Sequence, residues 1–302
     1  MNILDECARI RIIELSLIDL YKEDLIQSPM HMSIGQETVA VGVCHSLTNN
    51  DRLFATYRSH AWYLAKGGDL YGFYCELMGR ADGVCKGKGG SMHLADVRVG
   101  FMGTSAIVGG TISHAVGAAL ALRQLKKEGN LTVSVFGDGA MDQGVYHESL
   151  NFASNFNLPV VFVLEDNSYA VNSKSENRQG FDAIKLAESY NIQIFELQDC
   201  SDPIEVSNMM EKIYEQVRIT QKPAWVRLKT QRYLTHVGIE IYDRKQNKLV
   251  FSSHDNIPND LIAQHIEANS PKIVAIRNEI KKDIERARLS KFPSIASLLE
   301  DI

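Results

Sequence analysis

The chain has 302 residues, a formal net charge of −5 and a hydrophobic content of 45%. This length allows one large α/β domain or two smaller ones, and the hydrophobic content is ordinary for a globular protein. The mildly acidic balance gives no reason to expect nucleic acid as a partner, and the apolar stretches fall short of the roughly 20 residues that a membrane span requires.

The cysteines predict a reducing environment. Their number is odd and none of them form a CxxC pair, so we expect neither a disulfide framework nor a zinc site. The N-terminal residues 1–15 are amphipathic and mixed in charge, unlike a secretory signal, which is basic and then apolar. We therefore expect a cytoplasmic protein. The cysteines are Cys7, Cys44, Cys75, Cys85 and Cys200.

The first part of the chain is predicted to be helical and then glycine-rich. Apolar residues recur at helical spacing over 4–28, which predicts an amphipathic helix. Further elements are expected at 35–47 (helix), 51–57 (strand) and 70–78 (helix). Residues 79–110 are rich in glycine and have little periodicity. A loop of that length within a compact domain is usually functional or disordered.

The second part alternates between helices and short apolar strands. Strands are expected at 131–136, 160–164, 192–197 and 224–230, and helices at 112–127, 144–156, 181–190, 202–220 and 270–288. Strands that are apolar throughout, with helices between them, indicate an α/β fold whose parallel sheet has helices on both faces. No repeat or linker is visible, so we expect a single domain over 1–302 with a helical start and a helical tail from about 240 to 302.

Polar side chains follow two consecutive predicted strands. Asp138 lies in the run Gly137-Asp138-Gly139-Ala140, directly after the strand at 131–136, and Asn167 follows the strand at 160–164. The spacing fits one strand–helix–strand unit, which places both side chains at the same edge of the sheet. A divalent cation such as Mg²⁺ prefers oxygen ligands and keeps phosphate oxygens in its shell. Small residues beside Asp138 would let a diphosphate approach the backbone.

Other interpretations of these motifs remain open. Asp, Asn and Gly also favour turns for purely local reasons. A dinucleotide fingerprint would need a third glycine after Gly139, which is absent, although the acidic Glu165 and Asp166 keep a nicotinamide cofactor as a weak competitor. The glycine-rich run at 86–91 lacks the spacing of a P-loop.

Arginine and histidine residues in loops are further candidates. Arg58, after the strand at 51–57, could bind a terminal phosphate through two parallel hydrogen bonds, or it could form a surface salt bridge. His31, His60, His93 and His236 lie in loops or at the edges of elements, where a histidine is either structural or functional.

Several blocks together resemble one known family. GDGAMDQG followed by EDNSYAV is similar to the thiamine motif of the alpha subunit of the thiamine-diphosphate-dependent decarboxylating component of 2-oxo acid dehydrogenases, of the pyruvate, acetoin and branched-chain types. The blocks HMSIGQE, YRSHAWYLAKG, GKGGSMHL and IVGGTISHAVGAALA match in the same order. The resemblance covers roughly residues 10–240.

The resemblance implies a role for each matching position. Asp138, Asn167 and the carbonyl of Tyr169 would hold Mg²⁺. The thiamine diphosphate would be bound by Tyr57, Arg58, Ile107, Val108, Gly137, Asp138, Gly139, Ala140, Asn167, Tyr169, Arg232 and His236. His31 and His236 match histidines near cofactor and substrate, and they are the catalytic candidates because imidazole exchanges protons near neutral pH.

The same resemblance implies a partner chain. In the family, the glutamate that activates the cofactor's pyrimidine comes from the beta subunit, so an α2β2 assembly acting on a 2-oxo acid is expected, with a lipoyl-bearing acyltransferase as a further partner. The sequence departs from the family pattern after His236, where it reads VGIEIYDRKQNK, and Asp166 replaces the first Asn of the usual pair. The altered loop supports an alternative: a biosynthetic carboligase or non-oxidative decarboxylase that uses a small acceptor. A nonenzymatic subunit with the same fold is a third hypothesis.

Overall fold

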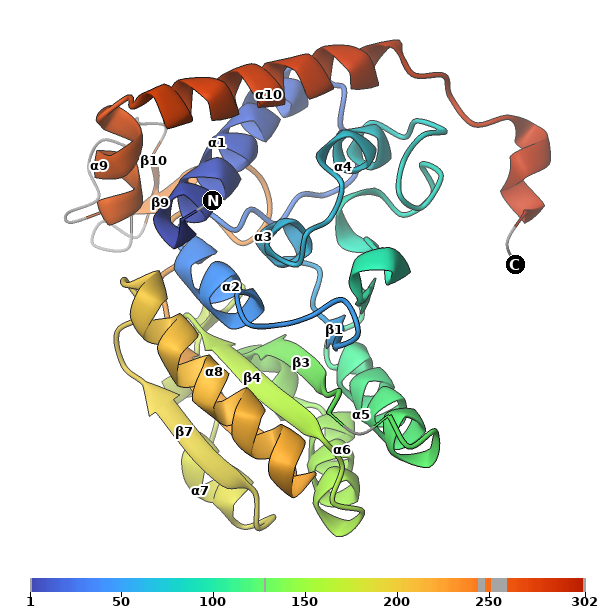
Figure 1. Ribbon diagram of the computed structural model, residues 1–302. Helices are drawn as coiled ribbons and strands as arrows, with labels where there is room; N and C mark the ends of the chain where they lie inside the picture. The colour runs from blue at the N-terminus through green and yellow to red at the C-terminus, as the bar shows by residue number, and fades with distance from the viewer. Residues whose placement is uncertain (1, 128, 244–247, 251–259, 301–302) are drawn as a thin grey trace.

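The computed structural model describes residues 2–127, 129–243, 248–250 and 260–300 (Figure 1). The helices are α1 Ile3–Lys22, α2 Glu37–Cys44, α3 His60–Ala65, α4 Leu70–Leu77, α5 Gly110–Gln124, α6 Gly144–Asn155, α7 Ala183–Glu188, α8 Pro203–Thr220, α9 Leu261–Glu267 and α10 Pro271–Leu289. The strands are β1 Arg52–Phe54, β2 Phe101–Gly103, β3 Thr132–Gly137, β4 Val160–Asp166, β5 Tyr169–Ala170, β6 Ser173–Lys174, β7 Gln193–Leu197, β8 Ala224–Lys229, β9 Ile241–Asp243 and β10 Lys248–Val250.

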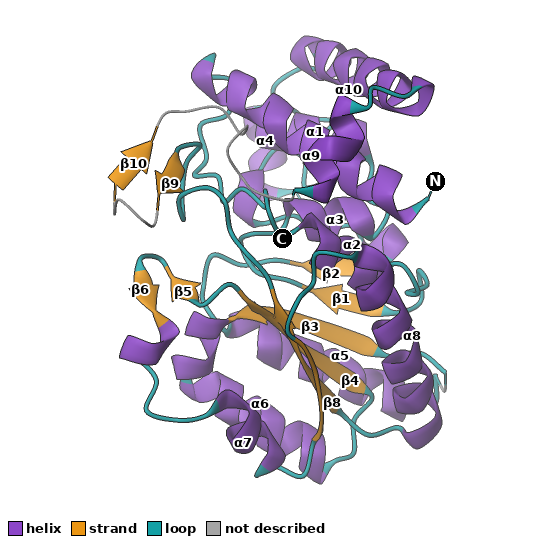
Figure 2. Ribbon diagram, turned by 90° about the vertical axis from the view of Figure 1, so that its left-hand side faces the viewer, coloured by secondary structure: helices purple, strands orange, loops and turns teal. Residues whose placement is uncertain are grey.

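The main sheet has six strands in the order β2-β1-β3-β4-β8-β7, and every neighbouring pair is parallel. Figure 2 shows α8 on one side of the sheet and α6 and α7 on the other. The expected α/β fold, a parallel sheet covered on both faces, is therefore confirmed. Because all strands run in one direction, their carboxyl ends meet at one edge.

Alternate residues of the central strands enter two separate cores. Val161 and Val163 of β4 pack in the core that α1, α2 and α8 share, whereas Phe162 and Leu164 pack in the core formed with α5, α6 and α7. Side chains of a strand alternate between the two faces of its sheet, so a strand buried on both faces requires apolar residues at most positions. This requirement explains the continuous apolar run of β4.

Some boundaries differ from those expected. The first helix ends at Lys22 rather than at residue 28, because Asp24 takes a left-handed conformation with φ 60° and turns the chain. The short helix α3 was not anticipated, and the glycine-rich segment contributes strand β2 to the main sheet. Strand β4 extends through Asp166, two residues beyond the expected end.

The glycine-rich segment wraps around a buried carboxylate. Glu76 of α4 is 0% exposed, and it accepts backbone N–H bonds from Cys85, Gly87, Gly89 and Gly90 at 2.7–3.1 Å. Gly87 and Gly90 have φ of 72° and 60°, a region that favours glycine. The amide groups of this loop are thus directed at a carboxylate of the same chain, which explains the glycine content without a phosphate.

Among the described residues, none of the helices has the length and apolar character that crossing a bilayer requires. At the far side of the helical layer, α10 crosses α1 and α4 (Figure 1).

Candidate functional site

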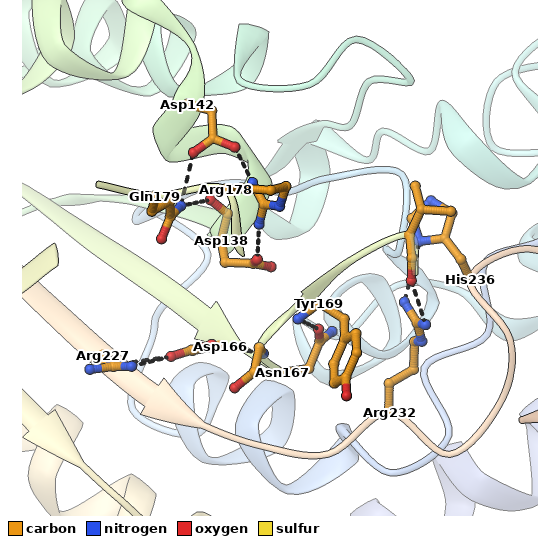
Figure 3. Close-up of polar contacts among 12 residues, drawn as sticks. Asp138, Asp142, Asp166, Asn167, Tyr169, Arg178, Gln179, Arg227, Arg232 and His236 are labelled. Carbon is orange, nitrogen blue, oxygen red and sulfur yellow. Dashed lines mark hydrogen bonds and ion pairs between the residues drawn. The ribbon is translucent and has the colours of Figure 1, made fainter. Parts of the chain in front are cut away.

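The carboxyl ends of β3 and β4 bring the two sequence motifs together. The strands pair in parallel with Gly137 opposite Glu165, so the residues that follow each strand emerge at the same edge. After β3 the chain forms a tight 3-10 turn over Asp138–Asp142, and after β4 it leads through Asn167 into the short hairpin of β5 and β6. Figure 3 shows Asp138 and Asn167 near this edge.

A cavity of about 290 Å³ opens at this edge. Its volume is close to the lower end of the range for small-molecule sites. Residues from distant parts of the chain line it: Thr56, Tyr57, Arg58, Ser105, Val108, Gly109, Gly137, Asp138, Gly139, Ala140, Asp142, Gln143, Glu165, Asn167, Tyr169, Ala170, Val171, Arg178, Arg232 and His236. Nearly all of the cofactor-binding residues expected from the sequence are therefore neighbours in the structure.

Asp138 is a buried carboxylate with a cationic neighbour. It is 3% exposed, and Arg178 bridges it to Asp142 (Figure 3). Gln179 adds hydrogen bonds of 2.9 Å to the carbonyl of Asp138 and to the Asp142 carboxylate. Burial raises the pKa of Asp138 to about 6; Arg178 opposes the rise, and the charges of Asp166 and Asp142 add to it.

Asn167 presents its amide in a defined orientation. Its Nδ2 donates to Oε1 of Gln36 at 3.1 Å, and its Oδ1 accepts from the backbone N–H of Tyr169 at 3.1 Å. Asn167 and Tyr169 both belong to the lining of the cavity.

Asp166 faces away from this site. Its carboxylate pairs with Arg227 at 2.7 Å (Figure 3). It also pairs with Lys229 at 3.3 Å. Burial alone would raise its pKa, but the hydrogen bond from Arg227 and the charge of Lys229 hold the pKa of Asp166 below the usual value. Asp166 is thus paired with basic residues of β8 and does not line the cavity.

Arg58 is buried and does not form the surface salt bridge that was the alternative. It is 5% exposed and donates to the carbonyls of Met32 at 2.6 Å and His236 at 3.2 Å. Burial lowers its pKa. Glu165, also buried at the cavity, has its pKa raised to about 7 by burial, and the nearby Gln36 and Arg58 side chains oppose this rise.

Three rings gather beside the cavity. His31 lies 4.4 Å from the Tyr57 ring and 5.1 Å from the His236 ring, measured between centroids, and Tyr57 and His236 are 5.5 Å apart. Burial raises the pKa of Tyr57. His31 is not part of the lining and lies behind these two residues. The two catalytic candidates are thus in mutual contact, although they are distant in the sequence.

Both histidines are neutral at physiological pH. Burial, together with the charge of Arg58, lowers the pKa of His31 to about 3 and that of His236 to about 4. Nδ1 of His236 lies 3.4 Å from the guanidinium groups of Arg58 and Arg232. Because an arginine can only donate, the neutral His236 carries its proton on Nε2.

Arg232 links the His236 loop to the hairpin. It is 6% exposed, and it donates to the carbonyls of Leu234 at 3.0 Å and Val171 at 2.9 Å. Val171 has φ 54°, a genuine outlier for a β-branched residue. Arg232 thus fixes a strained hairpin turn at the margin of the cavity.

The residues present fit a divalent cation with a diphosphate. The donor set of one carboxylate, one amide oxygen and a backbone carbonyl is oxygen-only, which suits Mg²⁺. A Cβ added to Gly137 would meet no atom within 4 Å, so the backbone there is open to a ligand. Within the described ranges, Nδ1 of His31 is buried without a hydrogen-bond partner. The described residues contain no group of three His, Cys, Asp or Glu side chains that could hold a metal ion. The expected Mg²⁺ ligands would not form such a group, because Asp138 is the only one of these residue types among them.

Some expectations from the sequence differ from the structure, and some residues were missed. Ile107 is 73% exposed and lies outside the lining, whereas its neighbour Val108 lines the cavity. Arg178 and Gln179 were not anticipated, because they lie in a segment without periodicity and no local pattern links them to Asp138. Of the altered loop after His236, residues 244–247 lie outside the described residues.

Comparisons with known proteins agree with this geometry. The family model of the dehydrogenase E1 component matches residues 5–288. The chain is 35% identical to the alpha subunit of acetoin:2,6-dichlorophenolindophenol oxidoreductase of Bacillus subtilis, over 94% of this chain and 87% of that protein. It is 34% identical to the alpha subunit of the pyruvate dehydrogenase E1 component of Rickettsia typhi, over 90% of this chain and 86% of that protein.

Solved structures support the fold. The transketolase of Campylobacter jejuni superimposes with a TM-score of 0.62 at 15% identity, and the match covers 96% of this chain and 47% of the transketolase. The chain thus spans about half the length of that transketolase.

Proposed function

Because the chain belongs to the dehydrogenase E1 component family, we propose that it is the alpha subunit of a thiamine-diphosphate-dependent enzyme that decarboxylates a 2-oxo acid. The observation that carries this proposal is the meeting of Asp138, Asn167, Arg58 and His236 around one cavity at the carboxyl edge of the sheet. The relatives are named as alpha subunits of acetoin and pyruvate enzymes, which favours this function over a carboligase with a small acceptor.

In this proposal Asp138, Asn167 and the Tyr169 carbonyl hold Mg²⁺, and Tyr57, Arg58, Gly139 and Ala140 contact the diphosphate. When bound, thiamine diphosphate supplies the cationic ring that accepts the electrons released as CO₂ leaves. The protein itself must bind the charged end of the cofactor, exclude water and move protons.

His236 and His31 are the proposed proton carriers. His236 bears its proton on Nε2 and is held by two arginines, so that proton has a fixed position. Burial and the arginine charges keep its pKa low. An anion bound between Arg58 and Arg232 would offset those charges and raise the pKa of His236 toward the range useful for proton transfer.

Ile107 and Val108 are proposed to meet the part of the cofactor that extends beyond this chain. Their side chains are 73% and 41% exposed, which fits residues completed by another subunit. We propose that the beta subunit supplies the pyrimidine-activating glutamate in an α2β2 assembly, that a lipoyl-bearing acyltransferase accepts the product, and that the complex is cytoplasmic. All five cysteines are free thiols, as a reducing compartment would keep them.

The test is calorimetric titration of thiamine diphosphate with Mg²⁺ into the complex of this chain and its partner. Asp138→Asn should abolish measurable uptake, because it removes the charged cation ligand. Asp166→Asn is the matched control: its carboxylate faces Arg227 and Lys229, so uptake should persist. Unchanged uptake in Asp138→Asn would overturn the proposed site, and no uptake by the wild type would overturn the function.

A further inference from the structure

The segment Gly35-Gln36-Glu37 is held rigidly on both sides of Gln36. Glu37 is 0% exposed; its carboxylate is bound by Arg11, and it also accepts from the N–H of Gly35 at 2.9 Å. Gly35 has φ 96°, and a Cβ there would lie 2.3 Å from the carbonyl oxygen of Gln231. The chain on either side of Gln36 is therefore closely packed and hydrogen-bonded.

The side chain of Gln36 contacts another residue and does not cap its own helix. It occupies the N-cap position of α2, but its side chain makes no capping hydrogen bond. Instead it is 1% exposed, and its Oε1 accepts from Nδ2 of Asn167 at 3.1 Å. Within the described part of the chain, Nε2 of Gln36 is buried without a hydrogen bond of good geometry, although the side chain lowers the pKa of Glu165.

The contact determines which way the Asn167 amide points. An asparagine amide has one oxygen and one nitrogen at its end, and only the oxygen can bind a cation. The Gln36 amide acts as a donor toward the Glu165 carboxylate, so its Oε1 is directed at Asn167. An amide oxygen can only accept, and it therefore faces the Asn167 nitrogen. The Asn167 oxygen then lies on the other side, where Tyr169 N–H also contacts it.

We infer that Gln36 is a positioning residue, whose carbonyl holds the Asn167 amide with its oxygen available to the divalent cation of the site. The inference rests on the proposed function and deepens it, since it assigns a role to Gln36, which the proposed cofactor contacts leave without one. Partners that orient metal ligands typically change metal affinity by about 10- to 100-fold when they are removed.

A double-mutant cycle on the complex with its partner separates orientation from a general structural effect. The probe is Mn²⁺ in the presence of thiamine diphosphate, with free Mn²⁺ measured by its paramagnetic resonance signal. Gln36→Met keeps the size of the side chain and removes the acceptor. We expect this change to weaken Mn²⁺ binding by about 10- to 100-fold.

The second background is Asn167→Asp. A carboxylate presents an oxygen in either orientation, so it needs no partner to turn it. In that background Gln36→Met should weaken Mn²⁺ binding by no more than about threefold, because the two effects are coupled. Gln264→Met, at an exposed position of α9, is the matched control and should bind Mn²⁺ like the wild type.

Two results would overturn the inference: equal losses from Gln36→Met in the wild-type and Asn167→Asp backgrounds, or no loss in either. Failure of the proposed function is distinguishable from both, because the wild type itself would then bind no Mn²⁺ together with thiamine diphosphate. Thermal unfolding of each variant reports folding independently of Mn²⁺ affinity.

Discussion

At the scale of single residues, Arg178 is the counter-ion of the carboxylate that the proposal assigns to the cation. It bridges Asp138 and Asp142, and its own side chain is 20% exposed. A guanidinium and a divalent cation are both attracted by the negative charge of the Asp138 carboxylate, so we expect them to compete for it.

Removal of this competitor should strengthen cation binding. We expect Arg178→Gln to raise the affinity for Mn²⁺, without any diphosphate, by about three- to tenfold, which corresponds to an ion pair worth about 1 kcal/mol. The measurement is an Mn²⁺ titration, with Arg277→Gln on the exposed face of α10 as the control. Weaker Mn²⁺ binding in Arg178→Gln would show that the guanidinium supports the site instead of competing for it.

The buried histidines predict a dependence of stability on pH. Folded His31 and His236 have pKa values of about 3 and about 4, whereas an unfolded histidine titrates near 6.5. As pH falls below about 6.5, the two histidines bind protons in the unfolded chain but stay neutral in the folded chain. The free energy of unfolding therefore decreases. Acidification from pH 7.5 to pH 5.5 should lower the free energy of unfolding by about 1 kcal/mol for each histidine.

Urea unfolding at these two pH values tests this expectation. The variant His31→Gln/His236→Gln should lose less stability on acidification than the wild type does, because two of the proton-binding groups are gone. Carboxylate effects are common to both proteins and cancel in the comparison. Identical losses in the two proteins would mean that neither histidine has a lowered pKa.

At the scale of elements, the site depends on helices that are packed unusually close. Gly42 lies within α2, and a Cβ added there would lie 2.6 Å from Cβ of Val206 and 3.1 Å from the carbonyl oxygen of Pro203, both on α8. Helix α2 begins beside Gln36, so its distance from α8 helps to set the position of that residue.

A double-mutant cycle tests this packing. We expect Gly42→Ala to destabilise the chain by about 1–3 kcal/mol through overpacking. In Gly42→Ala/Val206→Ala the smaller partner makes room for the added methyl, so the double variant should be more stable than the sum of the two single effects predicts. Thermal unfolding gives the measurement, and strict additivity would show that the two residues do not meet.

The carboxylate of Glu76 organises the glycine-rich loop from within α4. Glu76→Gln would replace one acceptor oxygen by an N–H₂ group that faces backbone donors. We expect the free energy of unfolding to fall by about 3 kcal/mol, because charge-assisted hydrogen bonds are lost and buried donors are left unpaired. We also expect faster proteolysis within residues 85–90. Glu215→Gln at an exposed position of α8 should have no comparable effect. Unchanged proteolysis in Glu76→Gln would contradict this account of the loop.

At the scale of the whole molecule, the proposed catalytic centre needs a second chain. The described cavity is lined by oxygen-bearing side chains, arginines and a histidine, which the proposal assigns to the charged end of the cofactor. The proposed activating glutamate belongs to the beta subunit. The single-domain organisation of residues 1–302 stays a prediction.

Decarboxylation should therefore require the partner. We expect the isolated chain to release no CO₂ from a 2-oxo acid, and the complex with its beta subunit to do so. A partner whose activating glutamate is replaced by glutamine is the control: it should assemble and bind cofactor but remain inactive. Full activity of the isolated chain would contradict both the assembly and the assignment of roles.

The sequence by itself determined the parallel α/β sheet and the pairing of Asp138 with Asn167. Both follow from local rules: apolar strands buried on two faces, and a strand–helix–strand spacing that returns the chain to the same edge. The family blocks added Tyr57, Arg58 and His236, and the structure brings them to the same cavity.

Only the tertiary structure decided how these side chains are oriented. Three contacts join residues that no periodicity relates: the tilted ring contact of His31 with Tyr57, the ion pair of Arg178 with Asp138 and the hydrogen bond between Gln36 and Asn167. The pKa values of the histidines likewise depend on burial and on arginines from other elements. Such contacts arise from packing between distant segments, so local patterns in the sequence do not predict them.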